Sequence, residues 1–120
     1  MYTQQDDGDI LFTISLDSYE ATVVIEAIRD AVMEATYNMI TNKGLRDNCD
    51  IETAQRMLNA QVKLYTRTLM AYKHETDNHR TRMIDAWLAT VELDEIWWDK
   101  INLTTNATTW EDIPHVKVPK

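Results

Sequence analysis

The sequence predicts a mainly α-helical protein, and three observations support this prediction. Only two glycines and two prolines occur among the 120 residues, so little interrupts a helix. Three long segments place apolar residues three and four positions apart, which is the spacing of one helix face. The alternation typical of strands occurs only before the first segment and near the C-terminus. We therefore expect an antiparallel three-helix bundle or a long helical hairpin, with a short N-terminal strand and an extended C-terminal tail.

The composition is that of one globular domain. Apolar residues make up 44% of the chain and charged residues 27%, which suffices for one core at this length. No linker or repeat divides the chain, so residues 1–120 are predicted to form a single helical domain. Within it, residues 1–9 are predicted to be a mobile acidic head and residues 103–120 an extended tail. The single cysteine, Cys49, excludes an internal disulfide.

The strand is predicted at residues 10–16, where Phe12, Ile14 and Leu16 alternate with residues of the other face. A second extended segment, residues 114–119, has a proline at each end, as edge strands tolerate. Three arrangements stay open. The two segments pair as a ribbon, each lies over the helices, or the strand pairs with its copy in a dimer.

The first helix is predicted from Asp17, whose side chain caps it together with Glu20, to the stop signal at residues 42–44. Glu26, Asp30 and Glu34 lie on the side opposite its apolar arc. The arc consists of Val24, Ile28, Ala31, Val32, Ala35 and Met39.

The second helix is predicted from Asp50 to about His74, after a loop at residues 45–49. Its back is basic and carries Arg56, Lys63 and Arg67. The apolar stripe contains Ile51, Leu58, Val62, Tyr65, Leu69 and Tyr72. A second apolar flank, Met57, Leu64 and Ala71, predicts that this helix contacts more than one neighbour.

The third helix is predicted from about His79 to Ile101, after a break at residues 76–78. Alternatively, the second and third helices continue as one kinked rod. Asp85, Glu92 and Asp99 repeat every seven residues and are predicted to form an acidic line along one side. Residues 102–110 are rich in threonine and are predicted to be irregular.

The best enzymatic candidate is the cluster of His74, Glu75, Asp77 and His79, which has side chains able to bind a metal. A solvated helix junction with a capping Asp77 explains the same residues. Cys49 lies in an acidic turn, which disfavours its thiolate, and neither glycine belongs to a phosphate-binding pattern. We therefore predict no enzymatic activity, no catalytic residue, no metal and no cofactor.

Four tryptophans occur in the last third of the chain. Trp87 and Trp98 share the apolar side of the third helix and are predicted to be core residues. Trp97 and Trp110 lie elsewhere and are candidate anchors for a protein partner, since large aromatics are enriched at interface hot spots. Covering of the helices within the chain is the alternative for both.

Self-association is predicted because the amphipathic helices carry more apolar surface than one hairpin hides. We expect a homo-oligomer, a dimer in the first instance, held by opposite charges. The basic residues are Arg56, Lys63 and Arg67, and the acidic partners are Asp85, Glu92 and Asp99.

These observations favour a non-catalytic protein-binding module, an adaptor or an inhibitor. The alternative is an acidic mimic of nucleic acid, with Glu26, Asp30 and Glu34 on its face. In size, acidity and lack of a motif, the chain resembles the small proteins that bacteriophages direct against host systems. The net charge of −8 argues against direct binding of nucleic acid. The polar N-terminus and the absence of a long apolar run predict a cytoplasmic protein without a membrane partner.

Overall fold

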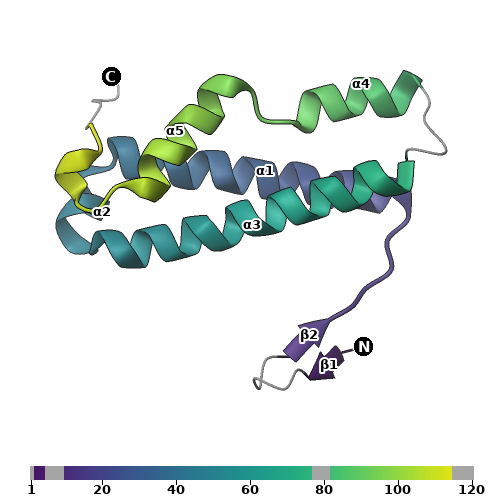
Figure 1. Ribbon diagram of the computed structural model, residues 1–120, viewed down its shortest axis with the longest axis horizontal. Helices are drawn as coiled ribbons and strands as arrows, with labels where there is room; N and C mark the ends of the chain where they lie inside the picture. The colour runs from purple at the N-terminus through teal and green to yellow at the C-terminus, as the bar shows by residue number, and fades with distance from the viewer. Residues whose placement is uncertain (1, 5–9, 77–81, 115–120) are drawn as a thin grey trace.

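The computed structural model describes residues 2–4, 10–76 and 82–114 of the chain (Figure 1). The protein is mainly helical, as the sequence predicts, and the helices form a bundle. In chain order the elements are β1 (Tyr2–Gln4), β2 (Ile10–Phe12), α1 (Ser18–Thr41), α2 (Lys43–Asn48), α3 (Ile51–Thr76), α4 (Arg82–Val91), α5 (Glu95–Asn106) and the 3₁₀ turn η1 (Trp110–Asp112).

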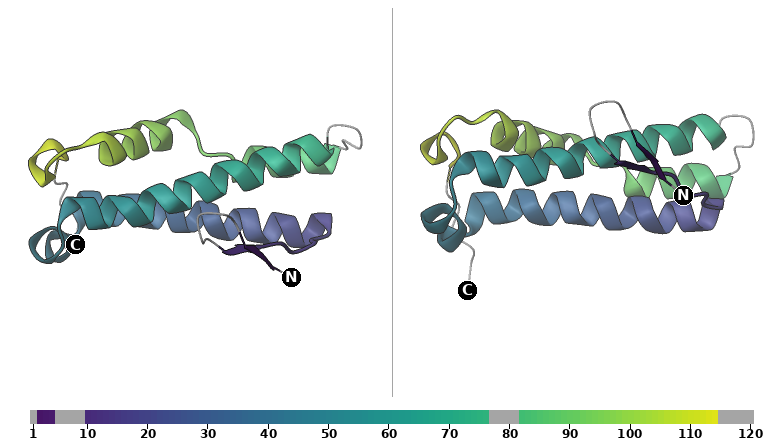
Figure 2. Two further views of the ribbon diagram at one scale, coloured as in Figure 1. Left: turned by 60° about the horizontal axis from the view of Figure 1, so that its bottom comes forward. Right: turned by 90° about the horizontal axis from the view of Figure 1, so that it is seen from below.

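The long helices α1 and α3 lie side by side and antiparallel, and the short α2 joins them. They form the first two layers of the bundle. Helices α4 and α5 follow one another back along one face of this pair (Figure 2). We call α4, α5 and η1 together the third layer. No helix in the described ranges is both long and apolar enough to cross a bilayer.

Polar side chains fix the two ends of α1. The Asp17 carboxylate accepts a hydrogen bond from the Glu20 amide (2.7 Å), and the Glu20 carboxylate accepts one from the Asp17 amide (3.1 Å). This capping box confirms the predicted start. At the other end, Asn42 terminates α1, and its side chain accepts a hydrogen bond from the Leu45 amide (3.0 Å). Because that bond caps a new helix, the loop predicted at residues 45–49 is wrong over residues 45–48, which belong to α2.

The prediction of a single third helix is wrong at residues 92–94. The chain leaves α4 after Val91 and starts α5 with Asp94, whose carboxylate accepts a hydrogen bond from the Trp97 amide (2.9 Å). The carbonyls freed at the end of α4 find donors on the long helices. The Tyr65 hydroxyl donates to the Val91 carbonyl, and the Arg29 guanidinium donates to the Thr90 carbonyl.

Helix α5 continues past residue 103, where the extended tail was predicted to begin. The Thr104 and Thr105 hydroxyls donate to the carbonyls four residues earlier (2.8 and 2.9 Å), and the Thr104 side chain is fully buried. Burial therefore outweighs the low helix propensity of threonine. Residues 102–106 are helical rather than irregular, and residues 110–112 form η1.

The alternative of one kinked rod is also wrong, because α4 turns back beside α3. The Tyr72 and Trp87 rings meet edge to face with centroids 5.1 Å apart. Farther along, the Lys73 ammonium pairs with the Glu92 carboxylate. Both contacts join the C-terminal part of α3 to the third layer.

The N-terminal segment forms a two-stranded antiparallel sheet in which Tyr2 faces Phe12. Strand β2 covers only residues 10–12 of the predicted 10–16, and β1 takes residues 2–4 of the predicted mobile head. This hairpin stands clear of the helices on the side away from α4 and α5 (Figures 1 and 2). The rest of the head and residues 115–119 of the predicted ribbon lie outside the described residues.

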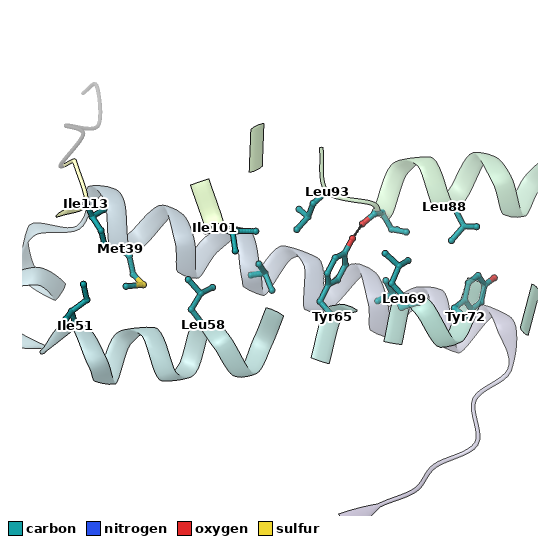
Figure 3. Close-up of a cluster of buried hydrophobic side chains, with 13 residues drawn as sticks. Met39, Ile51, Leu58, Tyr65, Leu69, Tyr72, Leu88, Leu93, Ile101 and Ile113 are labelled. Atoms are coloured by element: carbon teal, nitrogen blue, oxygen red, sulfur yellow. Dashed lines mark hydrogen bonds between the residues drawn. The ribbon is translucent and has the colours of Figure 1, made fainter. Parts of the chain in front are cut away.

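The core is a row of apolar side chains between the three layers (Figure 3). Helices α1 and α3 supply members every seven residues, which suits two nearly aligned helices packed along their length. Its members are Ile25, Val32, Met39, Ile51, Leu58, Tyr65, Leu69, Tyr72, Leu88, Val91, Leu93, Ile101 and Ile113.

Candidate interaction surfaces

Trp110 is engaged within the chain. Its indole N–H donates to the Cys49 carbonyl (2.8 Å), and the Arg46 guanidinium lies over its ring, 5.5 Å from the centroid. The same guanidinium donates to the carbonyls of Trp110 and Ile113. These contacts attach η1 to the loop between α2 and α3. They correspond to the predicted alternative in which Trp110 covers the helices, and its role as a partner anchor stays a prediction.

Trp97 is half-buried in the first turn of α5. It packs against the core, and the Lys100 ammonium lies over its ring, 4.8 Å from the centroid. One edge lines a hollow of about 400 Å³ between α1 and the third layer. The charged groups around this hollow already have partners within the fold: Arg29 with Asp30, Glu92 with Lys73, and Asp94 with the Trp97 amide.

The outer side of α5 is apolar next to Trp97. Ile96 is 65% exposed and Leu103 is 45% exposed, one above the other on the helix. Sequence analysis missed both residues. Their spacing of seven, on the side of the helix away from the core, could have indicated them. We call Ile96, Trp97, Asp99, Lys100 and Leu103 the α5 surface.

The basic residues predicted for self-association are accessible. Arg56, Lys63 and Arg67 are exposed along α3, on the side away from the core. Within the described ranges none of the three forms an ion pair, whereas Arg29 and Lys73 do.

The predicted acidic line does not form on one helix. The break at residues 92–94 leaves Asp85 on α4 and Asp99 exposed on α5, with Glu92 between the helices. Glu92 instead pairs with Lys73 of the same chain. The side chain of Asp85 lies outside the described residues.

The carboxylates of the predicted mimic face are all exposed on α1. Glu26, Asp30 and Glu34 stand one turn apart. The Asp30 carboxylate pairs with the Arg29 guanidinium (2.8 Å), which reduces the local negative charge.

No group of three or more potential metal-binding side chains gathers among the described residues. His74 and Glu75 are exposed on the last turn of α3, and Asp77 and His79 lie outside the described ranges. Cys49 is half-buried at the C-terminus of α2. Half of the candidate cluster therefore lies outside the described part of the chain.

Among the described residues, two side chains, Tyr65 and Asp112, have pKa values shifted from the ordinary ones, and their surroundings explain each shift. Burial raises the pKa of the Tyr65 phenol, more than the Leu93 backbone and the Arg29 charge lower it. Hydrogen bonds from Thr108, and then from Thr109, lower the pKa of the Asp112 carboxyl. Tyr65 closes the end of α4 and Asp112 caps η1, so both shifts belong to the fold.

The face of the α1–α3 pair opposite the third layer is uncovered. Met57 is 66% exposed and Leu64 is 50% exposed, and Ala71 is exposed one heptad further on. Helix α3 contacts more than one neighbour, α1 and α5, as predicted, but no helix of the described chain covers this flank. We call this surface the open face, and define it by Val24, Ala31, Ala35, Asn38, Met57, Leu64 and Ala71.

The open face is hollowed at both ends. A groove of about 230 Å³ is lined by Ala35, Asn38 and Met57. At the other end, a hollow of about 750 Å³ lies between Ala71 and the linker that contains Ile14 and leads to the hairpin.

No protein-family model, curated protein or solved structure matches this chain.

Proposed function

We propose that the protein is a non-catalytic protein-binding module, an adaptor or an inhibitor, that holds its partner on the α5 surface and works as a homodimer. One observation carries the proposal: α5 is fixed to the bundle on one side and exposes two large apolar side chains on the other. Ile101 and Thr104 are buried beneath it, while Ile96 and Leu103 are exposed above.

Rigid attachment is what makes this surface suited to binding. The Gln55 amide donates to the Thr104 carbonyl (2.8 Å) and the Ala107 carbonyl (2.6 Å), which fixes the end of α5 to α3. At its beginning, Leu93 is buried and the Trp98 ring lies against the ring of Tyr65 on α3, with centroids 6.3 Å apart. A helix held at both ends loses little conformational freedom when a partner binds, and tryptophan is enriched at interface hot spots.

The test is affinity capture from a lysate of the source organism or its host, with the double variant Ile96→Ser/Leu103→Ser beside the wild type. A matched control, Tyr19→Ser/Val23→Ser, removes two exposed apolar side chains from α1 instead. We expect one saturable partner with the wild type and the control, and its loss with the α5 variant. Equal recovery by all three proteins would contradict the proposal.

The mimic is the second candidate, favoured by the exposed row of Glu26, Asp30 and Glu34. Successive carboxylates stand about 6 Å apart along the axis, since one turn rises by about that length. Capture by such a row should collapse with added salt and in Glu26→Lys/Glu34→Lys. Capture on the α5 surface should persist in high salt, because apolar contacts are not screened.

A further inference from the structure

We propose that two copies of this chain associate through their open faces, about a twofold axis parallel to the helices. Helix α1 of each copy then lies beside α3 of the other, and the four helices form one antiparallel bundle. The inference rests on the homodimer in the proposed function and names its interface. It does not depend on the α5 surface.

The open face is shaped for helices to pack on it. On α1 it presents the small side chains Ala31 and Ala35 between larger ones, and on α3 it presents Met57 and Leu64 at heptad spacing. Small residues allow a neighbouring helix to approach closely, and heptad-spaced apolar residues are the pattern of aligned helices. The third layer occupies the opposite face, and no helix of the described chain packs on this one (Figure 2).

The area of the open face agrees with the area that each partner buries in a stable dimer. Two helices of about 24 residues form a strip about 36 Å long and about 20 Å wide, given the rise and diameter of a helix. Such a strip covers about 700 Å², close to the ~800 Å² that each partner buries in an interface of standard size.

Charges beside the open face select a second copy as the occupant. The outer side of α1 carries Asp30 and Glu34, and the outer side of α3 carries Arg56, Lys63 and Arg67, all exposed. The ion pair with Arg29 leaves the Asp30 side chain 60% exposed. One edge of the face is thus acidic and the other basic.

This charge pattern distinguishes the possible twofold axes. An axis parallel to the helices places each acidic edge against the partner's basic edge. An axis perpendicular to the helices, in the plane of the interface, places α1 on α1 and α3 on α3, so that like charges meet. Since like charges at an interface cost binding energy, the parallel axis is favoured.

The two hollows of the open face indicate which residues of α1 and α3 lie at similar heights. Ala21 and Tyr72 line the larger hollow, and Met39 and Ala54 line the smaller groove. Each step forward along α1 therefore corresponds to one step back along α3, as antiparallel helices with equal rise require.

Midway between those pairs, Asp30 stands level with Lys63. A rotation about an axis parallel to the helices leaves heights unchanged, so Asp30 meets the partner's Lys63, with the partner's Arg67 one turn away. Glu34, one turn further along α1, lies between the partner's Arg56 and Lys63. Both carboxylates therefore face bases of the other chain.

The N-terminal segment adds a second observation. The β1–β2 hairpin stands clear of the helices on the side of the open face (Figure 2). Phe12 and Ile14 are exposed, and Ile14 lines the hollow beside Ala71. A second copy seated on that face supplies the apolar surface that these side chains lack in the single chain.

The test uses two charge-reversed chains. Variant X is Asp30→Lys/Glu34→Lys, with two basic edges, and variant Y is Lys63→Glu/Arg67→Glu, with two acidic edges. Either variant alone places like charges in both contacts of the dimer, whereas one X and one Y place opposite charges in both. The molar mass of each sample is measured by light scattering after gel filtration, and circular dichroism follows helix content.

Controls carry the same charge changes away from the open face. They are Glu95→Lys/Glu111→Lys for X and Lys43→Glu/Lys100→Glu for Y, all at exposed positions. The mixture of X and Y is itself a control for folding, because an unfolded variant could not restore the dimer.

We expect twice the chain mass for the wild type and both controls, the single-chain mass for X and for Y, and twice that mass for their mixture. A monomeric wild type, dimeric X or Y alone, or a mixture that stays monomeric would each overturn the inference. Loss of partner capture in the α5 variant with an unchanged dimer, or the reverse, separates this result from the test of the proposed function.

Discussion

The two faces of the α1–α3 pair differ in how their neighbour is held. On the covered face, four side chains from the long helices and α2 donate to backbone carbonyls of the third layer. On the open face, the described side chains are mostly small or aliphatic, and the charges stand at its edges. The donors on the covered face are Arg29, Arg46, Gln55 and Tyr65.

The difference follows from the regularity of each neighbour. The third layer is broken into α4, α5 and η1, and every helix end leaves carbonyls without partners in the helix. Donors from other helices satisfy these groups, which makes the covered face specific to one irregular occupant. The open face has no such donors in the described chain, and this suits a continuous helix whose carbonyls are already bonded.

The largest expected contrast is between two adjacent residues of α3. Tyr65 is fully buried on the covered face, and Leu64 lies on the open face. Tyr65→Ala removes a large core side chain and leaves the Val91 carbonyl without its donor, so we expect a loss of about 3–5 kcal/mol in the free energy of unfolding. Urea denaturation followed by circular dichroism measures it.

The matched variant Leu64→Ala should cost less than about 1 kcal/mol when the protein is dilute enough to be monomeric, because the side chain is half exposed. At higher concentration it should weaken the dimer. Similar losses for the two variants in dilute solution would show that the faces do not differ as described.

A smaller effect is expected at the end of the covered face. Arg46→Met removes the donor to the Trp110 and Ile113 carbonyls, and also the cation above the Trp110 ring. We expect a loss of about 2 kcal/mol, the usual value for hydrogen bonds from a charged donor. Lys43→Met, at an exposed position of the same helix, should leave the unfolding midpoint within error.

Local sequence signals predicted the long helices well. Asp17 and Glu20 form the capping box that their spacing indicates, and the heptad positions of α3 are buried. The break at residues 92–94 was missed because Val91 and Leu93 are apolar like the rest of the stripe. The Tyr65 hydroxyl, which donates to the Val91 carbonyl at the end of α4, lies 26 residues earlier in the chain. Asp94 followed by Glu95 was the local signal of a new helix.

The candidate surfaces were predicted less completely, for a similar reason. Residue type marked Trp110 as an anchor, but its hydrogen bond reaches Cys49, 61 residues earlier in the chain. No local pattern contains that contact. Ile96 and Leu103 are seven residues apart, a local signal of one helix side, but only the packing of α5 on the bundle makes that side the exposed one. Exposure of the open face follows only from where α4 and α5 pack.

Alkaline pH should weaken the covered face through Tyr65. Burial raises the pKa of this phenol in the folded chain, so the folded state holds the proton more tightly than the unfolded state. Its contribution to stability is fully present below the ordinary tyrosine pKa of 10.0 and is lost as pH rises through the raised value. The free energy of unfolding should therefore fall more steeply above pH 10 in the wild type than in Tyr65→Phe. Parallel pH profiles would contradict this.

The smallest expected effect has the opposite sign and concerns Asp112, at the far end of the third layer. Its carboxylate accepts hydrogen bonds from the Thr108 amide (3.0 Å), the Thr108 hydroxyl (2.7 Å) and the Thr109 amide (3.1 Å), which lowers the pKa of the carboxyl. A lowered pKa contributes stability that is present above the ordinary value of 3.8 and is lost as pH falls through the lowered value.

Amide chemical shifts of Thr108 and Thr109, followed by NMR during an acid titration, measure this ionisation directly. The midpoint should lie below 3.8, and Asp112→Asn should abolish the transition. A midpoint at or above 3.8 would show that these hydrogen bonds do not hold the carboxylate in solution. Because Asp112 caps η1, its protonation should loosen the attachment of Trp110. Because Asp112 lies away from the open face, the variant Asp112→Asn should leave the mass of the proposed dimer unchanged at neutral pH. A change in that mass would mean that the two faces of the α1–α3 pair are coupled.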